Sequence, residues 1–271
     1  MQIGITGSVG ILGDSIKKKL KLKNKNIFKG KIENKKNIND WIKNNDFDVI
    51  IHLAAIVPIK IVNKNKKYAL KVNYYGTKNL INAINRLSKK KIWFFYASTS
   101  HVYPFKKTII KENQKTNPLS YYGKTKLLGE KYLLKNKKKI IPCVGRIFSF
   151  TSKKQSKLFI IPALISKLKS NKKVIKFTNI NHFRDFISIE DICGALIILM
   201  KSKARGVYNI CSGNKINIKS ILYKLNKKFN KKIIIEDNLN QTTLFGSNRK
   251  LIQKGWKLSK SNYLDYIYNN S

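Results

Sequence analysis

The chain has 271 residues, of which 42% are hydrophobic and 11% aromatic, so it has the material for a buried core and is not a disordered protein. Lys and Arg number 57 against 13 Asp and Glu, and the formal net charge of +44 raises the question of a nucleic-acid partner. The excess is Lys rather than Arg and is spread along the whole chain, which favours compositional drift over nucleic-acid binding.

The cysteines and the first residues indicate a reduced, cytoplasmic protein. Cys143, Cys193 and Cys211 are odd in number, far apart and set in apolar surroundings, so neither a disulfide framework nor a metal site is indicated. The opening MQIGITG lacks the architecture of a signal peptide, and apolar runs such as GALIILM are too short to cross a bilayer. We therefore expect no membrane partner.

Strand and helix patterns alternate through the first half of the chain. Residues 2–6 predict a buried strand, and Leu12, Ile16 and Leu20 then recur on one face of a helix. Further strands are predicted at 26–32, 47–55, 91–99 and 139–147, and further helices at 37–45, 68–87 and 121–134. This alternation predicts an α/β fold built on a Rossmann-type doubly wound parallel sheet.

The rhythm changes after about residue 150 to mixed short elements. Helices are predicted at 158–168, 190–201 and 218–229, and strands at 173–178, 208–210 and 232–236. We interpret residues 1–150 as a dinucleotide-binding Rossmann domain and 151–271 mainly as a smaller C-terminal substrate-binding lobe. The stretch 185–210 is expected to return to the first domain.

A glycine-rich segment, TGSVGILG, joins the first strand to the first helix. Gly7, Gly10 and Gly13 supply a tight turn, a close approach of the backbone to a ligand, and close packing of the helix. Backbone N–H groups and the positive end of the helix favour a phosphate at this turn. The segment therefore predicts a dinucleotide site, and a purely structural turn is the alternative.

Tyr122 and Lys126 are one helical turn apart in SYYGKTK, so their side chains share a face. A free phenol has a pKa near ~10, and a nearby ammonium favours the phenolate. Tyr122 is thus a candidate for proton transfer, with Lys126 lowering its pKa and binding a ribose. Thr99, at the end of the preceding strand, is placed to hydrogen-bond the same substrate oxygen.

Eight segments, in this order, resemble those of the extended short-chain dehydrogenase/reductase family of nucleotide-sugar epimerases, dehydratases and reductases. They are TGSVGILG (6–13), IIHLAA (50–55), VNYYGTKNL (72–80), STSHVY (98–103), PLSYYGKTKLLGE (118–130), GRIFSF (145–150), FRDFISIEDI (183–192) and YNICSG (208–213). GRIFSF lacks the Asn and the Tyr-Gly-Pro of the family pattern, so the sugar end of the pocket is left open.

The resemblance implies an NAD(P)-dependent oxidoreductase or epimerase acting on a nucleotide-activated sugar, best interpreted as a 4-keto-6-deoxy sugar reductase. The catalytic residues it implies are Thr99, Tyr122 and Lys126, with His101 as a further candidate. The coenzyme contacts it implies are Gly7, Gly10, Ile11, Leu12, Gly13, Leu53, Ala54, Ala55, Asn73, Tyr122 and Lys126. The substrate contacts it implies are Ser98, Ser100 and Arg184. It also implies a homodimer formed through the helices at 73–86 and 122–134.

Several of these assignments have alternatives. The 4,6-dehydratases of the family have Asp-Glu directly after the Thr, whereas this chain has Ser100-His101, which disfavours dehydration. His101 can serve in acid/base chemistry near neutral pH or can be a hydrogen-bonded wall of the pocket. For Arg184 the alternative is a salt bridge with Asp185 or Asp191. His52 is interpreted as a packed residue at a strand end.

The coenzyme preference depends on the short region after the first helix. Glu33 is the only acid near the predicted second strand, whereas Lys29 and Lys31 suit a 2′-phosphate, so we expect NADP in preference to NAD. The alternative from another functional class is a catalytically silent dinucleotide-binding protein whose basic surface docks RNA or another polyanion.

Overall fold

The computed structural model describes residues 1–152, 154–237 and 240–259, so residues 260–271 of the expected C-terminal lobe lie outside the described residues. Its centre is a parallel sheet of five strands in the order β1-β2-β3-β4-β9. The strands are β1 (Ile3–Thr6), β2 (Val49–His52), β3 (Ile92–Thr99), β4 (Ile140–Ile147) and β9 (Gly206–Ile210). Each of these strands is an almost continuous apolar run because both faces of the sheet are covered and both sets of side chains are buried.

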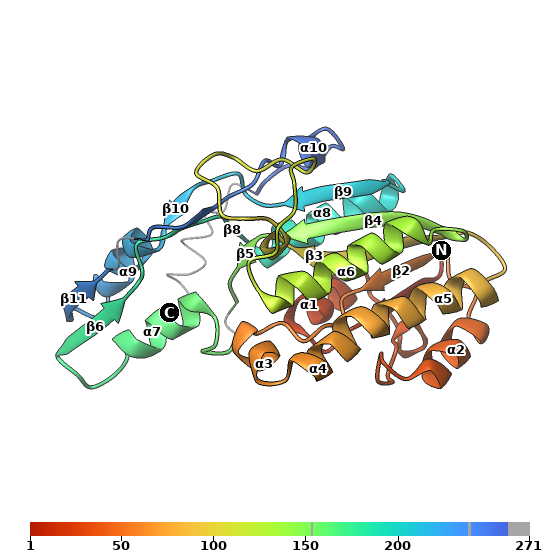
Figure 1. Ribbon diagram of the computed structural model, residues 1–271, viewed down its shortest axis with the longest axis horizontal. Helices are drawn as coiled ribbons and strands as arrows, with labels where there is room; N and C mark the ends of the chain where they lie inside the picture. The colour runs from red at the N-terminus through yellow and green to blue at the C-terminus, as the bar shows by residue number, and fades with distance from the viewer. Residues whose placement is uncertain (153, 238–239, 260–271) are drawn as a thin grey trace.

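Helices cover the two faces of the sheet in two layers (Figure 1). One core cluster joins Ile5, Ile51 and Phe95 to the helices α1 (Ile11–Lys19) and α8 (Ile189–Lys201). The other joins the alternate strand residues Ile50 and Phe94 to the helices α2 (Lys35–Lys43), α5 (Thr77–Leu87) and α6 (Tyr121–Lys135). Alternate side chains of one strand thus pack on opposite layers, which confirms the predicted doubly wound α/β fold.

The strand predicted at residues 26–32 is wrong except at one residue. Ile27 forms an isolated parallel bridge with Ile5, and the Phe28 N–H donates to the Ile5 carbonyl at 2.9 Å. A 3-10 turn, η1 (Asn24–Asn26), precedes the bridge, and the Asn34 N–H donates to the Lys31 carbonyl at 2.9 Å. The segment has a sheet neighbour on one side only and leaves it for the turn at Lys31–Asn34 that precedes α2, so no longer ladder forms.

The single helix predicted at 68–87 is divided. Its segments are α4 (Lys66–Leu70), the π-helical η2 (Lys71–Gly76) and α5, and α3 (Ile59–Lys64) comes before them. The π-helical turn contains the buried Asn73. Single π turns within helices are frequently found at functional sites, where they re-aim a side chain.

A smaller lobe extends to one side of the sheet (Figure 1). It contains α7 (Ile160–Leu168), α9 (Ile218–Asn226) and the parallel strands β6 (Val174–Thr178) and β11 (Lys232–Glu236), which share one core cluster. Short ladders lie between this lobe and the sheet, made by β5 (Ser149–Phe150) with β8 (Phe186–Ile187), and by β7 (Phe183–Arg184) with β10 (Ile216–Asn217) and β12 (Thr243–Leu244). After α8 the chain re-enters the central sheet as β9, beside β4.

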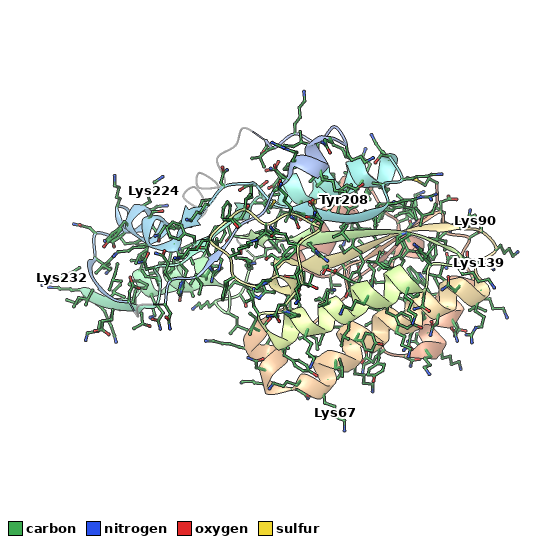
Figure 2. All side chains as sticks on the ribbon, turned by 45° about the horizontal axis from the view of Figure 1, so that its top comes forward. Lys67, Lys90, Lys139, Tyr208, Lys224 and Lys232 are labelled. Carbon is green, nitrogen blue, oxygen red and sulfur yellow. The ribbon has the colours of Figure 1, made fainter. Side chains whose placement is uncertain are left out.

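The lysines are distributed over the whole outline of the molecule. Figure 2 shows Lys67, Lys90, Lys139, Lys224 and Lys232 at widely separated points of both lobes. Within the part of the chain that the structure describes, no helix is both long and apolar enough to span a membrane.

Candidate active site

The glycine turn lies at the carboxyl ends of β1 and β2. Gly7 has a φ of +72°, and a Cβ added there would lie 2.6 Å from the Ala54 nitrogen, so this left-handed position has no room for a side chain. A Cβ at Gly13 would collide with the Gly7 carbonyl oxygen. Gly10 caps α1 with a φ of −70° and is exposed. The first N–H groups of α1 have no partners within the helix, so this turn fits a phosphate.

Three other residues assigned to the coenzyme form part of an apolar wall beside this turn. Ile11, Leu12 and Leu53 are partly buried and pack against the same core cluster as Ala97 and Phe150. Their partly exposed apolar surface suits a flat ring. Ala54 and Ala55 belong to the loop that follows β2, against which the Gly7 turn packs.

Tyr122 and Thr99 are brought together where α6 begins beside the end of β3. Ser120 caps α6 and accepts from the Gly123 N–H at 3.1 Å. Because Gly123 has no side chain, this first turn packs directly on the His101 carbonyl oxygen. The Tyr122 and Thr99 side chains are 8% and 6% exposed, and the Thr99 hydroxyl, which accepts from the His101 N–H at 3.2 Å, is close enough to Tyr122 to affect its phenol. The structure thus places an aromatic hydroxyl and an aliphatic hydroxyl at one point.

The ionisation of this site differs from the phenolate that the sequence led us to expect. Burial raises the pKa of Tyr122 above its ordinary value, and the hydrogen bond with Thr99 opposes that rise. Burial also lowers the pKa of Lys126 to about 7, with Glu130 opposing. Because Lys126 is itself desolvated, its charge does not offset the burial of the phenol, and Tyr122 is protonated at neutral pH.

Asn73 lies beneath the site and joins two of its walls. Its side-chain oxygen accepts from the Ile56 N–H at 2.8 Å, and its Nδ2 donates to the Ile56 carbonyl at 3.0 Å and to the Thr125 hydroxyl at 3.1 Å. The loop after β2 is thereby tied to α6. Asn73 is 0% exposed, so the structure shows it as a brace between these walls, and its contact with a coenzyme stays a prediction.

His101 stands beside Tyr122, with the two rings edge to face and their centroids 6.2 Å apart. Its Nδ1 lies 3.5 Å from the Ser120 hydroxyl. Burial, and secondarily the charge of Arg184, lowers the pKa of His101 to about 4. The imidazole is therefore neutral at physiological pH.

The two serines assigned to the substrate occupy different surroundings. The Ser98 hydroxyl donates to the Glu130 carboxylate, inside the interface between β3 and α6. Ser100 is 2% exposed and opens the 3-10 turn η3 (Ser100–Val102), where its carbonyl accepts from the Tyr103 N–H at 3.0 Å.

Arg184 approaches the site from β7 of the smaller lobe. Its guanidinium donates to the Phe183 and Thr242 carbonyls at 2.7 and 3.1 Å and to the Thr242 hydroxyl at 2.9 Å. The guanidinium carbon lies 5.0 Å from the centroid of the Phe105 ring, and burial lowers the pKa of Arg184 to about 10. These contacts hold the cation near His101, and no ion pair to a carboxylate is formed within residues 1–152, 154–237 and 240–259.

The alternative salt bridges of Arg184 do not form among the residues that the structure describes. Asp185 accepts hydrogen bonds from the Ser212 N–H and hydroxyl and from the Gly213 N–H, at 2.8, 2.8 and 3.0 Å. Asp191 is bonded by the hydroxyls of Ser188 and Ser259. Both carboxylates therefore organise loops of the chain.

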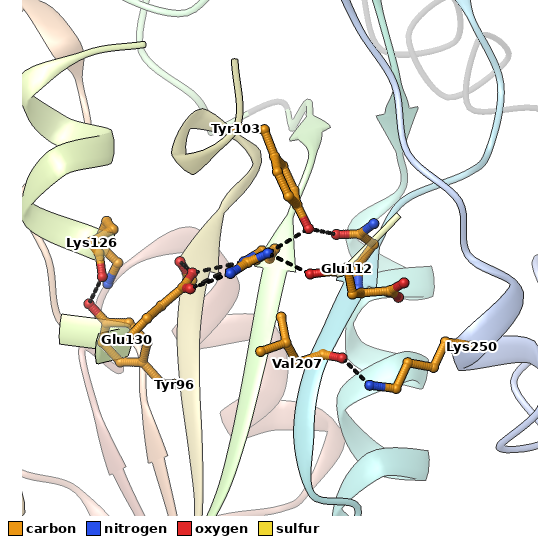
Figure 3. Close-up of polar contacts among 10 residues, drawn as sticks. Tyr96, Tyr103, Glu112, Lys126, Glu130, Val207 and Lys250 are labelled. Carbon is orange, nitrogen blue, oxygen red and sulfur yellow. Dashed lines mark hydrogen bonds and ion pairs between the residues drawn. The ribbon is translucent and has the colours of Figure 1, made fainter. Parts of the chain in front are cut away.

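A buried ion pair beneath α6 was not anticipated from the sequence (Figure 3). The Arg146 Nη2 lies 2.7 Å from the Glu130 Oε2, and the two side chains are 7% and 1% exposed. Arg146 also donates to the Tyr103 hydroxyl at 2.8 Å, and that hydroxyl donates to the Asn209 side-chain oxygen at 2.8 Å. The sequence offers Lys126, one helical turn before Glu130, as the local partner, so the pairing with Arg146 has no local signal.

Comparison with known proteins identifies the family. Residues 8–257 match the family model described as GDP-mannose 4,6 dehydratase. The chain belongs to this family of extended short-chain dehydrogenases/reductases. The match spans nearly all of the chain, which confirms the resemblance seen in the eight sequence segments.

Relatives of this family resemble the chain over most of its length. The chain is 25% identical to GDP-6-deoxy-D-talose 4-dehydrogenase from Aggregatibacter actinomycetemcomitans, over 93% of this chain and 90% of that protein. A structure of RMD from Pseudomonas aeruginosa complexed with NADPH has a TM-score of 0.86 and 22% identity, covering 100% and 98% of the two chains. The UDP-glucose 4-epimerase of Thermus thermophilus in complex with NAD has a TM-score of 0.83 and 18% identity, covering 99% and 97%. Both solved structures therefore have the same fold as this chain.

Proposed function

We propose that the protein is an NADPH-dependent reductase of a 4-keto-6-deoxy nucleotide sugar. A bound nicotinamide dinucleotide would supply the hydride. The single observation that carries the proposal is that Thr99, at the end of β3, and Tyr122, in the first turn of α6, are buried at one point, where burial keeps the phenol protonated. A protonated phenol at this point is prepared to donate to the oxygen of a carbonyl as that oxygen gains negative charge.

The residues around this pair have separate tasks. Thr99 orients the phenol and the substrate oxygen, and Lys126 presents an amine from the same face of α6 as Tyr122. The Gly7 to Gly13 turn would hold the pyrophosphate, with the apolar wall of Ile11 and Leu12 beside the reactive ring. Arg184, a cation without a carboxylate partner among the described residues, suits the diphosphate of the sugar nucleotide.

Two features of the site disfavour dehydration and any reaction that removes a sugar C–H proton. Ser100 and His101 follow Thr99, so the Asp-Glu pair of the 4,6-dehydratases is missing. A reaction that removes a proton from a sugar carbon needs a base beside that carbon. Burial lowers the pKa of His101 to about 4, so this imidazole is a weak base for such a step. The relative named GDP-6-deoxy-D-talose 4-dehydrogenase, itself an oxidoreductase of a 6-deoxy sugar by its name, supports the substrate class.

NADPH is proposed because of the charges beside the glycine turn. Lys29 and Lys31 are exposed and follow Ile27, the residue that pairs with β1, and Lys29 lines a cavity of about 510 Å³ together with Gly30 and Asn37. The carboxylate of Glu33 accepts from the Tyr68 hydroxyl at 3.3 Å. Lys29 and Lys31 outnumber Asp40, the acid that also lines this cavity, and Glu33 is engaged by Tyr68, so the charges suit a 2′-phosphate.

The test is turnover of NADPH or NADH with GDP- and dTDP-linked 4-keto-6-deoxy sugars, followed by absorbance. We expect oxidation of NADPH, a loss of about 10²- to 10⁴-fold in kcat for Tyr122→Phe, and little change for the matched Tyr121→Phe variant on the same helix. Turnover that survives Tyr122→Phe would contradict the assigned proton donor. For the coenzyme, Lys29→Glu with Lys31→Glu should weaken NADPH binding about tenfold and leave NADH unaffected, whereas Lys36→Glu on α2 serves as the charge control.

A further inference from the structure

A continuous chain of buried hydrogen bonds runs beneath the proposed coenzyme cleft. It begins at Thr6, the last residue of β1, whose hydroxyl lies 2.6 Å from the Nδ1 of His52, the last residue of β2. The Nε2 of His52 lies 2.9 Å from the hydroxyl of Thr77, the first residue of α5. Thr6, His52 and Thr77 are each 0% exposed.

The directions of these bonds fix the tautomer of the imidazole. The Thr77 hydroxyl donates its one proton to the Asn73 carbonyl at 2.7 Å, so towards His52 it accepts, and Nε2 carries the ring proton. Nδ1 of the neutral ring is then bare and accepts from the Thr6 hydroxyl. The Thr6 oxygen in turn accepts from the Ala54 N–H at 3.4 Å.

The surroundings of His52 keep the ring neutral. Burial, and secondarily the charge of Lys126, lowers the pKa of His52 to about 3. The ring packs between two aromatic side chains of β3, with centroids 5.9 Å from Phe94 and 5.8 Å from Tyr96. The ring therefore carries one proton at physiological pH, and the directions of these hydrogen bonds are fixed.

These hydrogen bonds connect three parts of the proposed cleft, namely the glycine turn, the loop after β2 and α6. At one end are Thr6, which directly precedes Gly7, and the Ala54 N–H, against which the Gly7 turn packs. At the other end Asn73 binds the loop after β2 and the Thr125 hydroxyl, and Thr125 donates to the Tyr122 carbonyl at 2.8 Å. The glycine turn and the helix of the proton donor are thus joined through one ring.

We propose that His52 is a positioning residue which, as the neutral Nε2–H tautomer, fixes the glycine turn relative to the helix that carries Tyr122 and Lys126. His52 itself contacts neither the coenzyme nor the substrate. This role rests on the function proposed above, because it assumes that a dinucleotide occupies the turn. The fixed tautomer does not depend on that assumption.

The tautomer is tested by NMR on the full chain with ¹⁵N-labelled histidine. The chain has three histidines, so His101→Gln and His182→Gln variants assign the signals. We expect the His52 ring to show a bare Nδ1 and a protonated Nε2, with no titration between pH 5 and pH 9. An Nδ1–H tautomer, or a ring that titrates near the ordinary pKa of histidine, would overturn the proposal.

The positioning role is tested by removing one hydroxyl while keeping its volume. Thr6→Val should weaken NADPH binding about tenfold and lower kcat as well, since the buried Nδ1 and the Ala54 N–H both lose their partner. Thr6→Ser restores the hydroxyl and should bind as the wild type does. Thr178→Val, the same change at an exposed position of β6, is the control.

The outcomes separate the two proposals. A folded Thr6→Val protein with wild-type coenzyme affinity and kcat would overturn the role of His52 while leaving the reductase proposal in place. A wild-type protein that binds neither NADPH nor NADH would overturn the proposed function, and with it the positioning role, whatever the NMR shows. Circular dichroism and thermal melts confirm that the variants compared are folded.

Discussion

Glu130 lies one helical turn beyond Lys126 on α6, but its carboxylate is bound by Arg146 at 2.7 Å and not by the lysine. The Lys126 Nζ instead lies 4.1 Å from the centroid of the Tyr96 ring. Arg146 takes the ion pair because its planar guanidinium meets both carboxylate oxygens, with hydrogen bonds from Nε at 3.2 Å to each. The Lys126 amine is thus buried while the nearby Glu130 carboxylate is engaged by Arg146.

The depressed pKa of Lys126 predicts a pH-dependent contribution to stability. Burial lowers the pKa of Lys126 to about 7 in the folded protein, whereas an unfolded lysine titrates near ~10.4. Between these values the unfolded state binds more protons, so the free energy of unfolding rises with pH. Relative to Lys126→Met, the coenzyme-free wild type should gain stability from about pH 7 towards pH 10 in urea titrations. A difference that does not vary with pH would contradict the desolvated amine.

Removing the acidic member of the buried ion pair should destabilise the protein strongly. Glu130→Gln keeps the volume but leaves the Arg146 guanidinium buried without its counter-ion, at a cost of about 3–5 kcal/mol in the free energy of unfolding. The control is Glu236→Gln, whose partner Lys176 is 67% exposed, and which should change stability by less than about 1 kcal/mol. Equal effects of the two variants in urea unfolding would refute the importance of the buried pair.

Two glycines of the turn should respond differently to a methyl group. Gly13→Ala introduces a Cβ that collides with the Gly7 carbonyl oxygen, so we expect a loss of folding stability and of coenzyme binding. Gly10→Ala places its Cβ 3.4 Å from the same oxygen, at a φ of −70° that alanine adopts freely, so it should fold normally. Its methyl group then obstructs only the ligand, and NADPH titration of the folded protein should show weaker binding. Reversed behaviour would contradict the placement of the pyrophosphate.

We expect His101 to cause no inflection in the pH dependence of kcat/KM near neutral pH. Because burial lowers its pKa to about 4, the ring is neutral throughout pH 5.5–8, and kcat/KM should show no inflection near ~6.5. His101→Gln should retain activity within about tenfold, far above Tyr122→Phe. The same shift makes His101 a source of stability that is lost as the pH falls from about 6.5 to about 4, since the unfolded state then binds the additional proton. An inflection near 6.5 that disappears in His101→Gln would show that the imidazole titrates in catalysis.

Local patterns were sufficient for much of the fold and for naming candidate residues of the site. The alternation of apolar strands with amphipathic helices predicted the parallel sheet, because a strand covered on both faces must be apolar throughout. The glycine spacing before α1 predicted the turn, since only residues without a Cβ fit at positions 7 and 13. The i, i+4 spacing placed Tyr122 and Lys126 on one face of a helix.

The sequence by itself determined most of the elements and which chemical groups are available, because helix and strand periodicity, glycine turns and residue type are local properties. Only the tertiary structure decided how those groups are paired and charged. Burial depends on neighbours that are distant in the sequence, so it alone established that Arg146 and not Lys126 binds Glu130, and that Tyr122 stays protonated. Two further features depend on contacts between distant segments, which sequence periodicity does not reveal. One is the pairing of Ile27 alone in the expected second strand, and the other is the position of the His52 ring between Thr6 and Thr77.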